Sequence, residues 1–224
     1  MMGCLILLSG GQDSCTCLAW ACNEFNNIHS ISFHYSQRHE IELDRAKELS
    51  KIAGCKSHIV VPVTSLPFFQ SSSALFKNSE SDIMNQHHLN PDLPASFVPG
   101  RNYIFLGLAA IRAYQLGIKD IVCGVCQTDY SGYPDCREYS IVAVEDALKK
   151  CMDFDFVIHT PLMHRTKKEI VEMMKELGKL HWYRSTHTCY NGKYPPCGSC
   201  PSCELRAKGF SESGIKDPLL GDYK

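Results

Sequence analysis

The sequence lacks long hydrophobic runs and an excess of charge of either sign. Nowhere in its 224 residues does an apolar stretch approach the roughly 20 residues that span a membrane, so no membrane partner is predicted. Lys and Arg number 23 and Asp and Glu number 24, which gives a formal net charge of −1. Proteins that bind nucleic acid tightly carry a basic surface. A nucleic-acid partner is therefore not predicted either.

Also missing are a secretory leader and two common nucleotide-binding motifs. The apolar run near the N-terminus follows no basic residues and is too short for a signal-peptide core, so we expect a cytoplasmic protein. Neither G-x-x-x-x-G-K-[ST] nor G-x-G-x-x-G occurs, which argues against a Walker A loop and a dinucleotide-binding Rossmann site. Hydrophobic residues make up 44% and charged residues 21%, the balance of a globular protein rather than a disordered one.

Apolar runs alternate with helical patterns along the chain. This alternation predicts an α/β fold with a mainly parallel sheet. We expect a nucleotide-binding domain over 1–180, with an insertion at about 64–98, and a C-terminal metal-binding region over 181–224. The insertion shows no dominant period, so it is interpreted as either disordered or a functional lid. Strands are expected at 4–8, 28–35, 58–63, 120–125 and 156–161, and helices at 14–25, 40–53, 101–117, 139–150 and 166–177.

Two of these helices carry more specific expectations. Helix 101–117 is almost wholly apolar, so it is predicted to be buried. Helix 166–177 begins with Thr166 and Glu169, the spacing of a capping box.

The hexapeptide Ser9-Gly10-Gly11-Gln12-Asp13-Ser14 follows the first expected strand and leads into a helix. Glycines permit tight curvature and close approach of an anion, and amides at a helix start face phosphate oxygens. The two serines add hydroxyl donors. The carboxylate is unsuited to a bare anion and favours a phosphate that arrives with Mg²⁺. The hexapeptide therefore indicates a site for a metal-bound nucleotide, and the alternative is an ordinary strand-turn-helix corner.

Four cysteines near the C-terminus follow the pattern C-x7-C-x2-C-x2-C, at Cys189, Cys197, Cys200 and Cys203. Four thiolates fill the tetrahedral coordination of Zn²⁺ and leave no open position, so the site is predicted to be a structural zinc site. Glycines and prolines between the cysteines favour a knuckle rather than a helix or strand. An iron–sulfur cluster uses the same ligands, and buried or disulfide-paired cysteines are the remaining alternatives. The CxxC of Cys123 and Cys126 is interpreted as incidental.

Further candidates lie after the expected strands, where ligands of parallel sheets bind. A guanidinium at the start of helix 101–117 can clamp phosphate or carboxylate. Tyrosines in the loop after strand 120–125 can stack on a planar base, and its carboxylates can accept hydrogen bonds from a guanine-like edge. The alternatives are a capped helix with its Arg in solvent, a turn-rich loop, and a solvated helix start. The candidates are Arg101, Asn102, Asp129, Tyr130, Tyr133, Asp135, Arg137 and Lys167.

The hexapeptide resembles the PP-loop of ATP pyrophosphatases, which split ATP between its α- and β-phosphates. With FHYSQRH, FVPGRN, GVCQTDYSGYPDCR, TPLM and the cysteine cluster, the chain resembles the 7-cyano-7-deazaguanine synthase family from residue 9 to residue 210. The resemblance implies a three-layer PP-loop domain in a homodimer with one Zn²⁺ per chain. It implies ATP-binding residues near the loop and the end of the second strand. These residues are Leu8, Ser9, Gly10, Gly11, Gln12, Asp13, Ser14, Phe33, Gln37 and Arg38.

The same resemblance implies the substrates 7-carboxy-7-deazaguanine, ammonia and Mg-ATP. The acid would be adenylated, ammonia would displace AMP to give an amide, and a second activation would give the nitrile. Asp13, Arg101, Asp129 and Lys167 are then the expected catalytic residues, with Asp129 as the candidate general base.

Two alternatives remain open at this point. A tRNA-modifying PP-loop enzyme would need a basic RNA-binding surface or an added domain, which the charge of −1 does not favour. A zinc-knuckle binding module on a degenerate nucleotide fold would not require an intact PP-loop.

Overall fold

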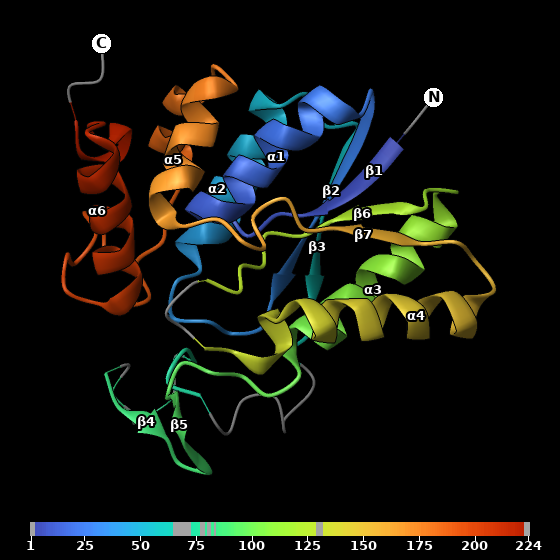
Figure 1. Ribbon diagram of the computed structural model, residues 1–224, viewed down its shortest axis with the longest axis horizontal. Helices are drawn as coiled ribbons and strands as arrows, with labels where there is room; N and C mark the ends of the chain where they lie inside the picture. Colours follow the sequence, from blue (N-terminus) through green and yellow to red (C-terminus); the bar gives the residue numbers. More distant parts are fainter. Residues whose placement is uncertain are drawn as a thin grey trace.

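The computed structural model describes residues 3–64, 73–76, 79, 82, 84–128 and 132–221 (Figure 1). Their main sheet has five parallel strands in the order β3-β2-β1-β6-β7. From β1 the chain moves outward through β2 and β3, then returns to the other side of β1 for β6 and β7. The strand order therefore reverses between β1 and β6. The strands are β1 (Gly3–Leu7), β2 (Asn27–His34), β3 (Ser57–Pro62), β6 (Asp120–Val122) and β7 (Val157–His159).

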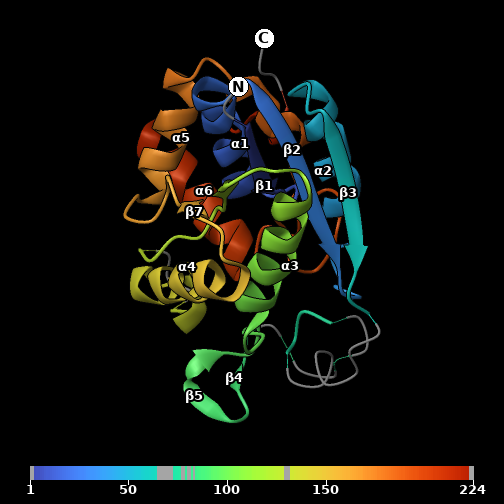
Figure 2. The same ribbon diagram turned by 90° about the vertical axis from the view of Figure 1, so that its right-hand side faces the viewer.

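Helices cover both faces of this sheet, which makes three layers (Figures 1 and 2). Alternate side chains of a strand point to opposite faces: Cys4 and Ile6 of β1 join one buried cluster, and Leu5 joins the other. The first cluster includes side chains from α1 (Gln12–Glu24), α2 (Ile41–Ile52), α5 (Lys167–Glu176) and α6 (Pro201–Ser213). The second includes side chains from α3 (Arg101–Gln115) and α4 (Glu138–Met152).

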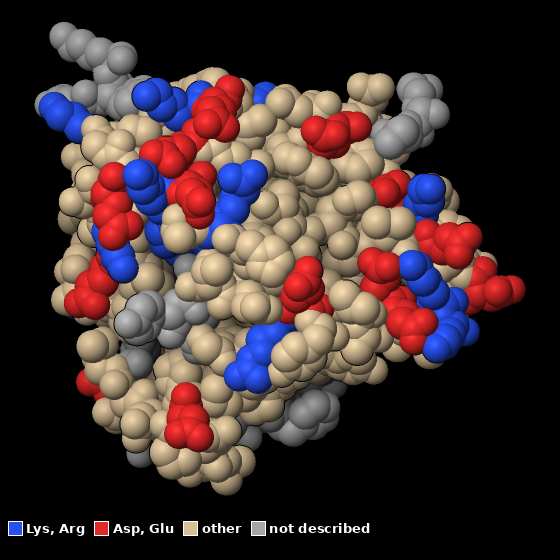
Figure 3. Space-filling model, viewed as in Figure 1, with Lys and Arg blue, Asp and Glu red and all other residues tan. Residues whose placement is uncertain are grey.

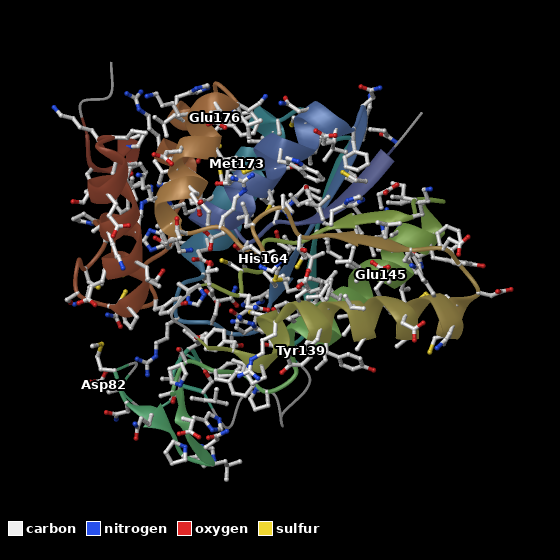
Figure 4. The ribbon with its side chains drawn as sticks, viewed as in Figure 1. Asp82, Tyr139, Glu145, His164, Met173 and Glu176 are labelled. Carbon is white, nitrogen blue, oxygen red and sulfur yellow. The ribbon has the colours of Figure 1, made fainter. Side chains whose placement is uncertain are left out.

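One outward-facing backbone N–H group of the edge strand β7 is hydrogen-bonded by a side chain of α4. Glu145, labelled in Figure 4, accepts a hydrogen bond from the backbone N–H of Ile158 at 2.7 Å and binds Lys149 at 2.6 Å. An exposed strand edge invites pairing with another chain, so this carboxylate removes one open donor.

The α/β fold with a parallel sheet is confirmed, as is the capping box of Thr166 and Glu169. One expectation was wrong. Helix α3 is not wholly buried, because Tyr103, Ile111 and Tyr114 face outward. The described part of the region 64–98 contains a hairpin of β4 (Gln86–His87) and β5 (Asn90–Pro94), so that part is ordered, and its role as a functional lid remains a prediction.

The cysteine region is not only a knuckle, because α6 begins inside it. Pro201 occupies the first helical position, where a proline needs no amide donor. The expectation of a knuckle without a helix was therefore wrong from Pro201 onward. Among the described residues, none of the helices combines the length and apolarity required to cross a membrane.

Candidate functional site

A cavity of about 270 Å³ lies at the carboxyl ends of β1, β2 and β6. Ligands of open parallel sheets bind where the strand order reverses, and this cavity occupies that position. The loop after β1 forms one wall, Phe33 at the end of β2 forms another, and Arg101 at the start of α3 forms a third. Tyr190 from the cysteine region also lines it. The cavity therefore unites segments from both ends of the chain.

The loop after β1 is held in shape by its own serines. The Ser14 hydroxyl accepts hydrogen bonds from the amides of Ser9 and Gly10 at 3.2 Å and donates to the Gly11 carbonyl at 3.1 Å. Gly11 is the N-cap of α1 and has no side-chain cap. An uncapped helix start facing a cavity is suited to an anion.

Gly10 has two reasons to lack a side chain. Its φ is +90°, in the left-handed region, and a Cβ would overlap the carbonyl oxygen of Glu42 on α2. The loop after β1 and helix α2 are therefore in backbone contact, which fixes the loop relative to α2.

We expect Gly10→Ala to lower the free energy of unfolding by more than about 3 kcal/mol, because strain and backbone overlap add. Gly54→Ala is the matched control, since Gly54 has a φ of +68° and no neighbour within 4 Å. It should lose about 1–2 kcal/mol from the left-handed conformation alone. Urea unfolding of both variants compares them, and equal losses would refute the contact.

Asp13 and Lys167 join the starts of α1 and α5. The Lys167 Nζ lies 2.9 Å from Oδ1 and 2.7 Å from Oδ2 of Asp13. The Lys167 side chain is 10% exposed and the Asp13 side chain 27%, so the ion pair is largely shielded from solvent. Lys167 does not line the large cavity but a smaller one beside it. The loop carboxylate and this ammonium therefore neutralise each other at the cavity wall.

Arg101 and its neighbours form the wall opposite the loop. Its guanidinium lies 5.8 Å from the centroid of the Tyr133 ring, and Tyr35 is a further neighbour. Asp135 accepts the backbone N–H of Asn102 at 3.0 Å, so it caps α3. The Asn102 side chain reaches Cys136 Sγ at 3.2 Å.

The remaining candidates are less uniform in position. Phe33 lines the cavity, and its ring stacks on that of Phe105 with 4.2 Å between the ring centroids. Gln37 lines it too, and its Oε1 accepts the Tyr35 amide at 2.9 Å. Arg38 instead binds carbonyls of the 64–98 region, including that of Phe76 at 3.0 Å.

Arg137 does not line the described cavity, and the structure does not describe two further candidates. Arg137 is exposed and binds the Tyr139 hydroxyl at 2.8 Å, away from the cavity. Asp129 and Tyr130 lie outside the described residues.

The four cysteines converge as their spacing predicts. All four Sγ atoms lie within 4.8 Å of one another, and those of Cys197 and Cys203 are 3.9 Å apart. Ligands about 2.3 Å from a tetrahedral Zn²⁺ are about 3.8 Å apart, so this donor set fits a metal ion. A Cβ on Gly192 would overlap the Arg38 carbonyl, which shows how closely the cysteine segment packs on the loop after β2.

Comparison with known proteins identifies the family. The model of queuosine biosynthesis protein QueC matches residues 3–214. The 7-cyano-7-deazaguanine synthase of Chromobacterium violaceum is 46% identical over 220 residues, covering 96% of this chain and 92% of that protein. That of Bacillus subtilis is 43% identical, covering 93% of each.

The chain belongs to the QueC family.

The fold, but not the sequence, also resembles that of a protein outside the QueC family. The solved structure of a 4-thiouridine synthetase–RNA complex with bound ATP has a TM-score of 0.54 and 17% identity. The match covers 95% of this chain and 50% of that one. It supports the three-layer architecture around the PP-loop.

The structure of this QueC-family chain places a buried carboxylic acid in the cavity wall, and sequence analysis did not identify that residue as a candidate. Glu42 of α2 lines the cavity, and its Oε2 lies 3.5 Å from Nε2 of His39. Burial raises the pKa of Glu42 well above its ordinary value of 4.5, although Arg101 opposes the shift. Burial, with Arg101 and His187, lowers the pKa of His39 to about 3. The sequence shows this acid as one of several charges on a helix, with no signal that it faces inward.

The raised pKa of Glu42 should make the free energy of unfolding depend on pH. The folded state keeps a proton on Glu42 that the unfolded chain releases above about pH 4.5, so stability falls as pH rises from there toward the folded pKa. In Glu42→Gln the fall should be smaller, by up to about 1.4 kcal/mol per pH unit.

Denaturant unfolding at pH 5, 6, 7 and 8 measures the difference. Glu176→Gln, at an exposed position on α5 (Figure 4), is the control and should follow the unsubstituted protein. Parallel curves for all three proteins would contradict the burial of the acid.

Proposed function

We propose that this chain performs the 7-cyano-7-deazaguanine synthase reaction with ATP bound in the 270 Å³ cavity. The observation that carries the proposal is the meeting of the PP-loop, Phe33 and Arg101 around one cavity in a chain of the QueC family. Phe33 and Phe105 offer a flat apolar surface to adenine. The loop amides face the triphosphate, and Arg101 faces the developing phosphate charge.

The reaction we propose uses each ATP to make an oxygen leave. The carboxylate of 7-carboxy-7-deazaguanine bonds to the α-phosphorus, and pyrophosphate leaves. Ammonia bonds to the activated carbon, and AMP leaves with that oxygen to give an amide. The amide oxygen then bonds to the α-phosphorus of a second ATP and pyrophosphate leaves again, after which loss of AMP and of the two N–H protons gives the nitrile. Asp13 is the residue suited to hold Mg²⁺ with ATP, and Lys167 to pair with phosphate oxygens.

Several residues remain candidates for contact with the 7-carboxy-7-deazaguanine. Tyr133, beside Arg101, offers a ring for the deazaguanine. Asp129 and Tyr130 remain predictions from the sequence. Glu42 is an additional acid in the cavity wall.

We further propose that the four cysteines hold one structural Zn²⁺. The sulfur spacing supports it, and a full set of thiolates leaves no coordination site for substrate. The ion, when bound, supplies folding free energy rather than chemistry. Thiolates require reducing conditions, which favours the cytoplasm for this protein.

The chain is also proposed to act as a homodimer. Tyr103, Ile111 and Tyr114 recur on one face of α3 and are about half exposed or more. Tyr139, labelled on α4 in Figure 4, and Val142 add to the exposed apolar surface. Apolar surface of this kind suits a subunit interface. Light scattering should give twice the chain mass of 25.2 kDa, and Tyr114→Glu should shift the mass toward one chain.

Incubation with ATP, Mg²⁺, ammonium and 7-carboxy-7-deazaguanine, followed by mass spectrometry, tests the function. The proposal expects the nitrile, AMP and pyrophosphate. A gel-shift assay with tRNA examines the RNA-modifying alternative. That alternative would need a basic surface, whereas Figure 3 shows Lys and Arg mixed with Asp and Glu on the face in view. AMP formation with tRNA but not with the acid would overturn the proposal.

A further inference from the structure

The large cavity contains a carboxylate that the ATP chemistry proposed above does not use. Among the described residues that line the cavity, the acidic ones are Asp13 and Glu42. Asp13 lies in the loop after β1 and is bound by Lys167. Glu42 comes from α2 and is 9% exposed, and within the described part of the chain His39 is its one ion-pair partner. Because the pKa of His39 is lowered to about 3, this imidazole is uncharged near neutral pH and leaves Glu42 without a cation at ion-pair distance.

The groups around Glu42 suit a small cation. His39 is 4% exposed, and its Nδ1 has no partner at hydrogen-bond geometry in the described structure, although the Tyr190 backbone lies near the ring. The centroid of the His39 ring is 5.9 Å from that of Tyr190 and 6.4 Å from that of Tyr35. Both tyrosines line the cavity, and aromatic faces attract cations. A carboxylate, an imidazole and two aromatic rings therefore meet at one part of the cavity wall.

Arg101 connects this part of the wall to the place where the acid is activated. Burial raises the pKa of Tyr35, Arg101 lowers it and donates a hydrogen bond to its hydroxyl, and Glu42 raises it further. The three side chains are therefore neighbours. Arg101 is the group proposed above to face the phosphate that activates the acid. A nitrogen nucleophile held at Glu42 would thus lie beside the carbon that it attacks.

Ammonium fits these groups better than a divalent metal ion does. Mg²⁺ and Ca²⁺ take about six or more ligands, mostly oxygen. In the described part of the chain, the four cysteines are the one group of three or more His, Cys, Asp or Glu side chains that converges on a common point. Ammonium instead donates hydrogen bonds to a carboxylate oxygen and to a neutral imidazole nitrogen. Because Arg101 repels a second cation, we expect ammonium to bind after a phosphate group has reached Arg101.

We propose that Glu42 and the rings of Tyr35 and Tyr190 form the binding site for the ammonium ion that supplies the nitrile nitrogen. The inference rests on the proposed function and assigns a place to its third substrate. His39, 3.5 Å from the carboxylate, is a positioning residue. One proton passes from ammonium to the Glu42 carboxylate, and the nitrogen lone pair then bonds to the activated carbon. The bond from that carbon to the AMP oxygen breaks, its electron pair leaves with AMP, and a second proton passes from nitrogen to the AMP phosphate.

Steady-state kinetics of Glu42→Gln tests the inference. The amide keeps the size of the side chain but not its charge, so the KM for ammonium should rise about ten- to hundredfold. The KM values for ATP and for the acid should stay within about twofold. Glu42→Asp keeps the charge and should restore part of the affinity for ammonium. Asp44→Asn removes a charge from an exposed position on the same helix, so it is the matched control and should leave the KM for ammonium unchanged.

Exchange of labelled pyrophosphate into ATP, measured with the acid and without ammonium, separates ammonium binding from structural damage. This exchange requires adenylation alone, so Glu42→Gln should exchange label at the rate of the unsubstituted protein. An equal fall in exchange and in nitrile formation would overturn the inference, because Glu42 would then act before ammonium enters. An unchanged KM for ammonium in Glu42→Gln would overturn it as well.

Rubidium, a cation of about the size of ammonium, gives a measurement that does not depend on turnover. Crystals soaked with Rb⁺ and AMP should show anomalous density beside the carboxylate of Glu42. The same soak of Glu42→Gln crystals should show none at this position.

The two proposals fail in distinguishable ways. Acid-dependent exchange by the unsubstituted protein, with an ammonium KM insensitive to Glu42→Gln and no Rb⁺ at Glu42, removes the ammonium site and keeps the function. Rb⁺ bound at Glu42, in a protein that shows no acid-dependent exchange, keeps the cation site and removes the function.

Discussion

Asp13→Asn is expected to lower nitrile formation about 10²- to 10³-fold, the usual cost of losing one preorganised electrostatic group. The substitution keeps the size of the side chain but removes the charge that faces Lys167 at 2.7 Å. It also removes the carboxylate best placed for a cation that accompanies ATP. The rate of nitrile formation with saturating acid and ammonium measures the effect.

Because a destabilised variant also loses activity, thermal stability is measured beside activity in a single and a double variant. Asp13→Asn removes the carboxylate that faces the largely buried Lys167 ammonium, and removing one charge of a largely buried ion pair is destabilising. The double variant Asp13→Asn with Lys167→Met removes that charge and should recover thermal stability without recovering activity. Asp44→Asn, at an exposed position on α2, should change neither. Activity of Asp13→Asn within threefold of the unsubstituted protein would exclude Asp13 from the chemistry.

Cys200→Ser is the second change with a large expected effect. Structural zinc contributes about 10–16 kcal/mol of apparent binding free energy in small domains, and a hydroxyl replaces one of four thiolates poorly. We expect the zinc content to fall from about one per chain to well below half, with lower solubility and a lower unfolding temperature. Elemental analysis of the purified protein measures the metal.

The reach of this change follows from where the cluster lies. Cys200 is buried at the start of α6, and Phe210 of that helix belongs to the core cluster that contains β1. Loss of the metal should therefore disturb the ATP cavity as well as the C-terminal segment. Cys151→Ser, at an exposed position on α4, is the control and should retain zinc and stability. Full zinc occupancy in Cys200→Ser would remove Cys200 from the ligand set.

Features with a local signal in the sequence were predictable. The β1 run leads directly into the glycine-rich loop, and the four cysteines converge because their spacing allows little else. The capping box was readable because its two partners are three residues apart.

Features decided by tertiary packing were not predictable in the same way. The apolar sequence of α3 suggested burial, but Tyr103 and Tyr114 are on its outer face. Glu42 is one of several charges on α2, and only the fold turns it toward the cavity. Thr188 and Ser202 have no motif of their own, and they reach the PP-loop because the cysteine segment folds back onto it.

Oxygen transfer from the acid to AMP tests the central claim most directly. With both carboxylate oxygens of 7-carboxy-7-deazaguanine labelled as ¹⁸O, the account predicts two AMP molecules per nitrile, each with one ¹⁸O on its phosphate. The pyrophosphate should contain no label. Unlabelled AMP, or label in ADP or inorganic phosphate, would contradict attack of the substrate oxygen on the α-phosphorus in this site.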